Sequence, residues 1–354
     1  MTQKESMLQR LLRLSVKPLI TIAVSLAIGA LLILNAGQNP LSVYAILFKG
    51  AFGTSTAFLG TLGKATPLIF TGLAAAVAAQ VGVFNIGIEG QLYMGALAAG
   101  VVGANCGALP AFLAVPLCLL AAMAAAAVWA LIPGLLNNKL GVNIFIMFFM
   151  LNNMAQLFTE YLSNGPFKGN LPDAATGKMA ASARLIRFSP FADLSVGILI
   201  ALALVAVCWF VMKKTRFGYE CSALGLNSRF SEYIGVKVGG VSLTVLLISA
   251  MIAGLAGAEP VMGAMGRFYA NFSNNLGFTG VSIGLLASNN PMGVVVFAVF
   301  FGALTNGGLQ MAASAGLPGD LINVLQSLMI ILISADFILR AARPGKAARK
   351  GAVG

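Results

Sequence analysis

Residues 65–105 read ATPLIFTGLAAAVAAQVGVFNIGIEGQLYMGALAAGVVGAN, in which two apolar runs are separated by a polar, glycine-rich break at 82–91. A helix that crosses a bilayer needs about 20 mostly apolar residues. Irregular backbone at that depth is tolerated only where protein or a water-filled cavity covers it. The stretch therefore predicts two membrane-spanning helices, 65–82 and 88–105, with a break between them that faces the interior of the protein.

The rest of the chain repeats this apolar pattern. Apolar residues make up 59% of the 354 residues and charged residues only 9%, against about 25% in a soluble domain, which excludes a soluble or disordered chain. Further apolar segments lie at 18–36, 109–135, 141–162, 192–212, 241–262, 292–310 and 319–339, with a short or broken one at 276–289. We therefore expect an all-α polytopic membrane protein with about ten transmembrane helices.

Positive charge predicts the orientation of these spans. With ten spans, the segments 1–17, 137–140, 213–240 and 340–354 share one side, and they carry fifteen basic and three acidic residues. Their excess of twelve equals the net charge of the whole chain, +12. Because basic loops stay on the cytoplasmic side, both termini are expected there and 163–191 is expected outside. The charge thus reports topology and does not indicate a nucleic-acid partner.

The break at 82–91 carries the one carboxylate of this region, Glu89. A charge within the membrane costs at least a few kcal/mol and faces a partner or a cavity. Gly87 and Gly90 allow the helix to break, and Glu89 falls in the first turn of the next helix, where the helix dipole stabilises an anion. The motif is expected to cap that helix or to contact a substrate.

A second glycine-rich segment, GFTGVSIG at 277–284, loosely resembles the first. In the topology above, the two segments begin spans three and eight, and spans 2–5 and 7–10 run in opposite directions. This arrangement is typical of an inverted repeat, in which broken helices meet near the midplane and form the substrate site.

Small residues recur at a spacing of four along two of the predicted helices. They are Gly95, Ala99 and Gly103 on one, and Ala250, Gly254 and Ala258 on the other. Such stripes allow helices to approach closely, so we expect them to pack against neighbouring helices.

Several chemistries are excluded. The chain has no histidine, its acidic residues are scattered, and its four cysteines show no metal-binding spacing, so neither a catalytic centre nor a metal site is expected. No phosphate-binding loop occurs, so we expect no bound cofactor in this chain.

Polar and aromatic residues within the predicted spans are the candidates for a substrate path. They are Phe84, Asn85, Glu89, Asn143, Phe148, Asn152, Asn153, Phe278, Asn289, Asn290 and Asn306. Amides offer donors and acceptors without a buried charge, which suits a neutral, hydroxyl-rich or heterocyclic substrate. Hydrogen bonds between helices are the alternative role for each asparagine.

The predicted cytoplasmic loop 213–240 is the longest on its side. Its sequence indicates two short helical pieces that are broken at Gly225-Leu226-Asn227, with Ser228 as a candidate cap of the second piece. The pieces could dock in a groove of a cytoplasmic partner or lie on the membrane surface.

Several of these motifs together resemble one family. The run Phe84–Gln91 is similar to the signature of binding-protein-dependent ABC import permeases of the ribose, branched-chain amino-acid and nucleoside group. The loop Ala223–Asn227, followed by Ile234-Gly235-Val236, resembles the coupling-helix region of that family, although Leu226 stands where an acidic or polar residue is usual. Similarity to its nucleoside and simple-sugar branch is carried by Gly277–Gly280, Asn289–Gly293, Phe301–Leu304 and Asn306–Gly308.

The resemblance implies that 1–354 form one permease domain of an importer in the inner membrane of a bacterium. It implies these partners: a cytoplasmic ABC ATPase that binds and hydrolyses ATP, a second permease subunit (identical or paralogous), an extracytoplasmic substrate-binding protein and membrane lipid. ATPase coupling is assigned on this basis to Ala223, Gly225, Asn227, Ser228, Ser231, Ile234 and Gly235.

Nucleosides are the first expectation for the cargo. The alternatives are simple sugars such as ribose, or a different class of protein, a self-sufficient secondary transporter, which also uses inverted repeats.

Overall fold

A computed structural model describes residues 23–35, 37–315, 323–324 and 327. The chain divides into two parts, one made of 1–46 with 309–354 and one made of 47–308. The predicted tails 1–17 and 340–354, most of the predicted span 319–339 and the placement of both termini lie outside the described residues.

The described residues form helices, and no β-strand occurs among them beyond three isolated bridges. The helices are α2 (Pro40–Phe52), α3 (Ser55–Ala79), α4 (Ile88–Asn105), α5 (Ala111–Leu140), α6 (Ile144–Asn164), α7 (Gly197–Lys214), α8 (Arg216–Leu226), α9 (Ser228–Tyr233), α10 (Val238–Pro260), α11 (Leu276–Leu286) and α12 (Pro291–Ala315). A helix over Ala23–Asn35 precedes them, a 3₁₀ turn η1 covers Ala181–Ala183, and a π-helical turn η2 (Val261–Met265) extends α10. The all-α prediction is confirmed.

Among the residues that the structure describes, five helices are long enough and apolar enough to cross a membrane. They are α3, α5, α7, α10 with its extension to Met265, and α12. The bent pair Ala23–Asn35 and Pro40–Phe52 is a sixth candidate, and α11 is a shorter apolar helix. The predicted spans 88–105 and 141–162 coincide with helices α4 and α6. The count of ten spans and the inverted repeat stay predictions.

In the first part, the described contacts join the Ala23–Asn35 helix to the beginning of α2. The Tyr44 hydroxyl donates a hydrogen bond of 2.6 Å to the Leu26 carbonyl.

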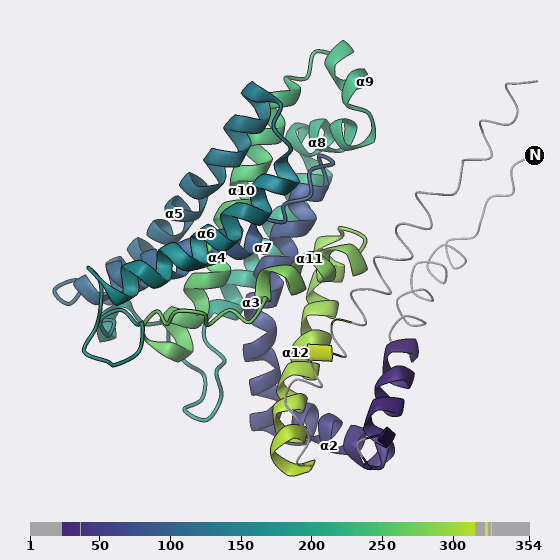
Figure 1. Ribbon diagram of the computed structural model, residues 1–354. Helices are drawn as coiled ribbons and strands as arrows, with labels where there is room; N and C mark the ends of the chain where they lie inside the picture. Colours follow the sequence, from purple (N-terminus) through teal and green to yellow (C-terminus); the bar gives the residue numbers. More distant parts are fainter. Residues whose placement is uncertain (1–22, 36, 316–322, 325–326, 328–354) are drawn as a thin grey trace, which may run out of the picture. The chain divides into compact units, whose positions relative to one another are not determined.

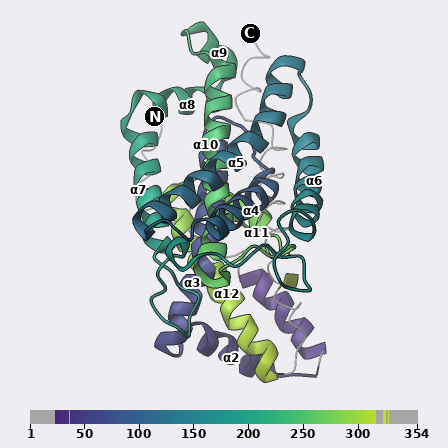
Figure 2. The same cartoon turned by 90° about the vertical axis from the view of Figure 1, so that its left-hand side faces the viewer.

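The second part is built around α3 and α10, which pack against each other (Figures 1 and 2). Helix α10 also packs against α4 and α5, and α3 packs against α11. A Cβ on Gly95 of α4 would lie 2.5 Å from the Cα of Gly254 in α10, and a Cβ on Gly254 would lie 2.5 Å from the Ala122 carbonyl oxygen in α5. A Cβ on Gly257 would overlap the Leu92 carbonyl. The predicted small-residue packing is confirmed, since these backbones approach closely only where side chains are absent.

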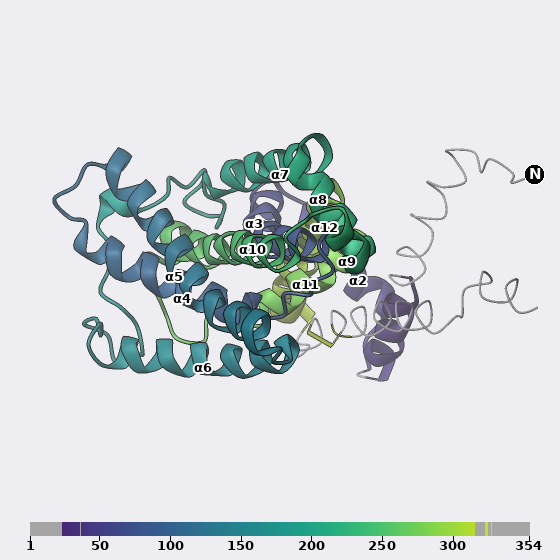
Figure 3. The ribbon, with the colours of Figure 1, turned by 90° about the horizontal axis from the view of Figure 1, so that it is seen from above.

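Helices α6 and α7 lie on opposite sides of α10 (Figures 2 and 3). Beyond the end of α7 come α8 and α9, while residues 165–196 form a layer at the other end of α7. This layer is ordered by backbone hydrogen bonds to the segment after α10, such as Thr176 N–H to Phe268 O (3.0 Å) and Leu185 N–H to Met262 O (3.0 Å). The predicted outer loop 163–191 is therefore a folded cover.

Candidate functional site

The second part of the chain holds a cavity of about 310 Å³ where α4, α6 and α11 meet the loop before α11. We call it the Glu89 cavity. Its lining residues are Glu89, Tyr93, Phe149, Asn152, Asn153, Gln156, Asn271, Asn274, Asn275 and Phe278. Six of the ten are amides, three are aromatic and one is acidic. The lining therefore offers many neutral donors and acceptors beside flat apolar faces.

Glu89 joins the beginnings of two helices. It lies in the first turn of α4, is only 7% exposed, and accepts a 2.6 Å hydrogen bond from the Gly277 N–H in the first turn of α11. The N-cap residue of α11, Asn275, makes no side-chain capping bond, so the Glu89 carboxylate serves in its place. A Cβ on Gly277 would lie 2.6 Å from the Glu89 nitrogen. Both helix dipoles favour a negative charge at this point.

Asn152 attaches α6 to the break before α4. Its side-chain oxygen accepts from the Gly90 N–H (2.9 Å), and its side-chain nitrogen donates to the Ile86 carbonyl (2.9 Å). Asn153 next to it is exposed and donates only within α6, to the Phe149 carbonyl (3.0 Å), among the hydrogen bonds described. The two adjacent amides therefore have different environments: the Asn152 side chain holds α6 to the break before α4, whereas the Asn153 side chain can rotate toward the cavity.

The cavity brings together four of the sequence-predicted path residues, namely Glu89, Asn152, Asn153 and Phe278. Three others pack at the break over 82–91 without lining the cavity. Asn85 is buried and bonds to the side chains of Gln91 (2.8 Å) and Ser249 (2.9 Å). Phe148 is buried against Gly87, where a Cβ would overlap its ring, and Phe84 lies half-buried within the break. These three residues shape the site and do not line the cavity.

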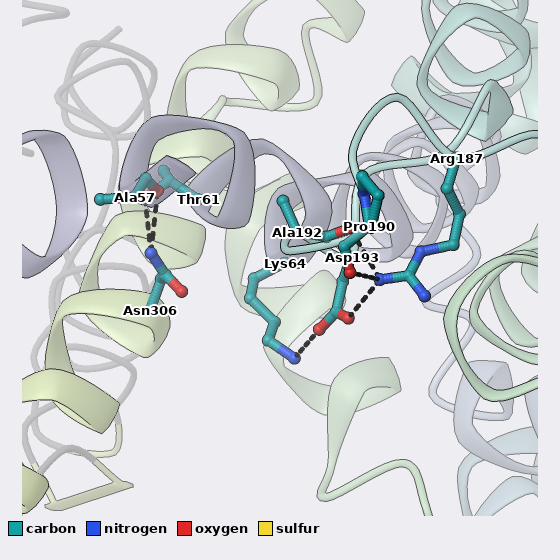
Figure 4. Close-up of polar contacts among 8 residues, drawn as sticks. All are labelled: Ala57, Thr61, Lys64, Arg187, Pro190, Ala192, Asp193 and Asn306. Atoms are coloured by element: carbon teal, nitrogen blue, oxygen red, sulfur yellow. Dashed lines mark hydrogen bonds and ion pairs between the residues drawn. The ribbon is translucent and has the colours of Figure 1, made fainter. Parts of the chain in front are cut away.

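Four further predicted residues lie away from the Glu89 cavity. Asn143 caps α6 by accepting from the Phe145 N–H (2.9 Å). Asn306 donates to the carbonyl of Ala57 in α3 (2.9 Å; Figure 4) and to that of Gly50 in α2 (3.1 Å), which holds α12 against the chain before and within α3. Asn289 and Asn290 line a different cavity, described next.

A second cavity, of about 510 Å³, lies where α7 continues into α8. We call it the α8 cavity. Its lining residues are Gln80, Trp209, Met212, Lys213, Thr215, Gly218, Tyr219, Ser222, Ser288, Asn289, Asn290 and Pro291. The Gln80 side chain crosses it by donating to the Asn289 carbonyl (3.0 Å). The turn between α11 and α12 therefore faces α8 across this cavity.

Sequence reasoning missed six residues of the Glu89 cavity: Tyr93, Phe149, Gln156, Asn271, Asn274 and Asn275. Gln156 was detectable, because it follows Asn152 by four residues and therefore shares its helix face. Asn271, Asn274 and Asn275 all have positive φ (58°, 45° and 64°), a conformation that asparagine tolerates better than most residues. A run of asparagines before a helix was the available signal.

The predicted break of the loop 213–240 is confirmed at Asn227, between α8 and α9. The predicted cap is wrong by one residue: the Asn227 side chain, and not that of Ser228, accepts from the Phe230 N–H (3.1 Å). Asparagine at this position has the extended backbone that an N-cap needs, with φ −158° and ψ 103°.

The remaining predicted coupling residues surround that cap. Ser231 is buried and donates its hydroxyl to the Asn227 carbonyl (3.0 Å), and Gly235 takes a positive φ of 87° after α9. Gly225 lies against the Gln80 carbonyl, which a Cβ would overlap. Ala223 is half-buried, while Ser228 and Ile234 are exposed.

One face of α8 and α9 is apolar and uncovered. Leu226 is 89% exposed and Tyr233 90% exposed, with Phe230 and Ile234 also exposed. Phe230, Tyr233 and Ile234 are three and four residues apart, which places them on one side of α9, and exposed apolar side chains on one side of a helix are typical of interaction surfaces.

Cys221 lies on the covered face of α8. It is fully buried, and burial raises the pKa of its thiol to about 11.

The family model for the branched-chain amino acid transport system permease component matches residues 57–334. The guanosine ABC transporter permease of Bacillus subtilis is 36% identical over 98% of this chain and all of its own length. A glucose ABC transporter permease of Haloferax volcanii is 36% identical over 91% of this chain and 88% of its own length. A nucleoside ABC transporter permease of Lactococcus lactis is 31% identical over 92% of this chain and 92% of its own length. No solved structure matches the chain significantly.

Proposed function

We propose that this chain, which belongs to the branched-chain amino acid transport system permease component family, is the membrane subunit of an ATP-driven nucleoside importer. The observation that carries the proposal is the 31–36% identity to a guanosine and a nucleoside permease over more than nine tenths of the chain. Its family and its apolar helices make it a multi-pass membrane protein. We place it in the bacterial inner membrane, with the basic segments 213–240 and 340–354 cytoplasmic.

The Glu89 cavity is the proposed substrate site. A nucleoside presents a flat base and a hydroxyl-bearing ribose, both uncharged. The rings of Tyr93, Phe149 and Phe278 supply stacking faces, and the five amides other than Asn152 supply donors and acceptors for the base edge and the hydroxyls. Glu89 is held by the α11 N-terminus, so its charge shapes the site without requiring a cationic cargo.

A simple sugar is the second candidate cargo. The glucose permease of Haloferax volcanii is as similar to this chain as the guanosine permease is, and amides bind sugar hydroxyls equally well. The aromatic lining favours the nucleoside, because a base stacks on more ring area than a pyranose does.

A second permease subunit, identical or paralogous, completes the proposed path. The Glu89 cavity is open along α6, where Phe149 and Asn153 of its lining are exposed. The neighbouring Met150, Met154 and Leu157 are also exposed and apolar. A second subunit against this face would close the path and bury these side chains.

The exposed apolar face of α8 and α9 is the proposed contact with a cytoplasmic ABC ATPase. ATP-driven closure of two such ATPases would move these helices and switch the path between its outward-open and inward-open forms. The ordered cover 165–196 is the proposed landing surface for an extracytoplasmic substrate-binding protein. On this view the chain carries no catalytic residue and binds no metal or cofactor, and ATP is bound by the partner.

The experiment that tests the proposal is reconstitution of the chain with its partner ABC ATPase and second permease in proteoliposomes, with the substrate-binding protein added on the extracytoplasmic side. The proposal expects guanosine uptake that requires hydrolysable ATP and ceases when the ATPase is inactivated. Uptake that persists without any ATPase and follows a Na⁺ or H⁺ gradient would identify a secondary transporter instead.

A further inference from the structure

Helix α7 is the element that leads directly into α8, yet it is weakly attached to the rest of the bundle. Its buried residues form one narrow stripe of mostly small side chains, Gly197, Ala201, Val205 and Cys208. Its main neighbours are α3 and α8. Leu199, Leu202, Val207 and Phe210 face outward. So narrow a contact leaves the position of α7 dependent on how its two ends are held.

The end of α7 that lies away from α8 is held by a buried carboxylate of α10. Glu259 is 4% exposed, and its Oε1 accepts a 2.7 Å hydrogen bond from the Ser195 hydroxyl. The same hydroxyl oxygen accepts a 3.0 Å hydrogen bond from the N–H of Gly197, and Gly197 is the first residue of α7. Glu259 therefore reaches the beginning of α7 through a single bridging hydroxyl.

The surroundings of Glu259 are shaped around this contact. A Cβ on Gly197 would lie 2.5 Å from the Glu259 Cγ, and a Cβ on Gly263 would lie 3.1 Å from the Ser195 Cβ. Both positions are glycine, so two elements leave room for the carboxylate and the hydroxyl. Burial of a carboxylate costs several kcal/mol of free energy unless hydrogen bonds compensate it. A carboxylate at such a position therefore indicates a specific role.

An ion pair fixes the same chain end to α3 (Figure 4). Two residues before Ser195, the Asp193 carboxylate binds the Lys64 ammonium at 2.9 Å and lies 3.8 Å from the Arg187 guanidinium. Arg187 also donates to the Ala192 carbonyl (3.0 Å), which closes the hairpin that leads into α7. The beginning of α7 is thus attached to α3 by Asp193 and to α10 by Ser195.

We propose that Glu259 is a positioning residue for transport: through Ser195 it anchors α7, so that movement of α8 reaches α10 instead of tilting α7 alone. This inference rests on the proposed function, because it assigns the movement of α8 to an ATPase. The route continues inward, since α10 packs directly on α4, whose first turn holds Glu89. Helices α8 and α9 also contact α10 directly, so without the anchor ATP is still consumed but less of the movement of α8 reaches the Glu89 cavity.

The test measures ATP hydrolysis and guanosine uptake together in proteoliposomes that contain the whole transporter. Glu259→Ala, Ser195→Ala and the double variant are compared with Glu259→Gln, whose amide oxygen can still accept from Ser195. The matched control is Asp173→Ala, an exposed acid of the same cover.

We expect Glu259→Ala and Ser195→Ala each to lower the number of guanosine molecules imported per ATP at least threefold. The double variant is expected to lose no more than either single variant, since the pair acts as one unit. Glu259→Gln and Asp173→Ala are expected to stay within twofold of the unaltered transporter.

An unchanged import per ATP in Glu259→Ala would overturn the proposal, and so would a loss in Glu259→Gln as large as in Glu259→Ala. If Glu259→Ala does not assemble, Ser195→Ala decides, and an unchanged ratio there overturns the proposal. Unaltered transporter that imports guanosine without ATP would instead refute the proposed function, so the two failures are distinguishable.

Discussion

Asn152 and Asn153 are adjacent amides of α6 that the structure places in different roles, and replacing each by alanine separates fold from substrate binding. Asn152→Ala removes two bonds of 2.9 Å, to the Gly90 N–H and to the Ile86 carbonyl. Asn153→Ala removes one bond within its own helix at an exposed position. The same chemical change therefore has two different expected results.

The magnitudes follow from these bonds. Interhelical hydrogen bonds in membranes contribute about 0.6 kcal/mol on average and up to about 1.7, and a buried polar group left without a partner costs about 1–3 kcal/mol. We expect Asn152→Ala to lower the free energy of unfolding by about 2 kcal/mol, which reduces the folded-to-unfolded ratio roughly 30-fold. For Asn153→Ala we expect a change within about 0.5 kcal/mol.

Substrate affinity is expected to respond in the opposite order. A hydrogen bond to a neutral group contributes about 0.5–1.5 kcal/mol, so Asn153→Ala should weaken guanosine binding about two- to tenfold. Denaturant titration of the purified permease measures the first quantity, and equilibrium guanosine binding to the reconstituted transporter measures the second. The reasoning is refuted if Asn153→Ala destabilises the permease as much as Asn152→Ala while leaving guanosine binding unchanged.

Three further predictions concern the coupling region and the packing. Tyr233→Asp adds a charge to the exposed face of α9 and should reduce ATPase co-purification at least fivefold without lowering permease yield; equal recovery would contradict docking there. Ser231→Pro removes the N–H that donates to the Asn227 carbonyl (3.0 Å), so ATP-dependent uptake should be lost while membrane insertion persists, and uptake at the original rate would refute it. The Cys221 pKa of about 11 leaves roughly one thiol in a thousand ionised at pH 8, so maleimide should not label Cys221 in the folded permease below pH 9. Fast labelling at pH 7 would show that the Cys221 side of α8 is not buried against the rest of the permease.

The helices were predictable because apolar runs and their breaks are local signals. The predicted span 88–105 and α4 (Ile88–Asn105) coincide because Gly87 precedes the helix and polar Asn105 ends it. The predicted span 65–82 begins ten residues after α3, which starts at Ser55. In the structure Lys64 lies inside the helix, since its charge is paired with Asp193, 129 residues away.

The candidate site was predictable only in part, since its geometry depends on distant contacts. Glu89 was expected at the beginning of its own helix, and it lies there, but its bond goes to Gly277 of another helix, 188 residues away. No local pattern reports such a partner. Asn306 has the residue type of a path residue, yet it donates to backbone carbonyls of the chain before and within α3. Residue type alone does not distinguish an amide that faces a cavity from one that joins helices.

Photolabelling tests the central claim most directly, namely that a nucleoside enters the Glu89 cavity under the control of an ATPase. The reconstituted transporter is illuminated with an azido-guanosine during ATP turnover, and the labelled peptides are mapped. We predict label within 149–156 and 271–278, removed by excess guanosine and absent when the ATPase is inactivated. Label confined to other segments, or label in the cavity that neither guanosine nor ATPase inactivation changes, would contradict the claim.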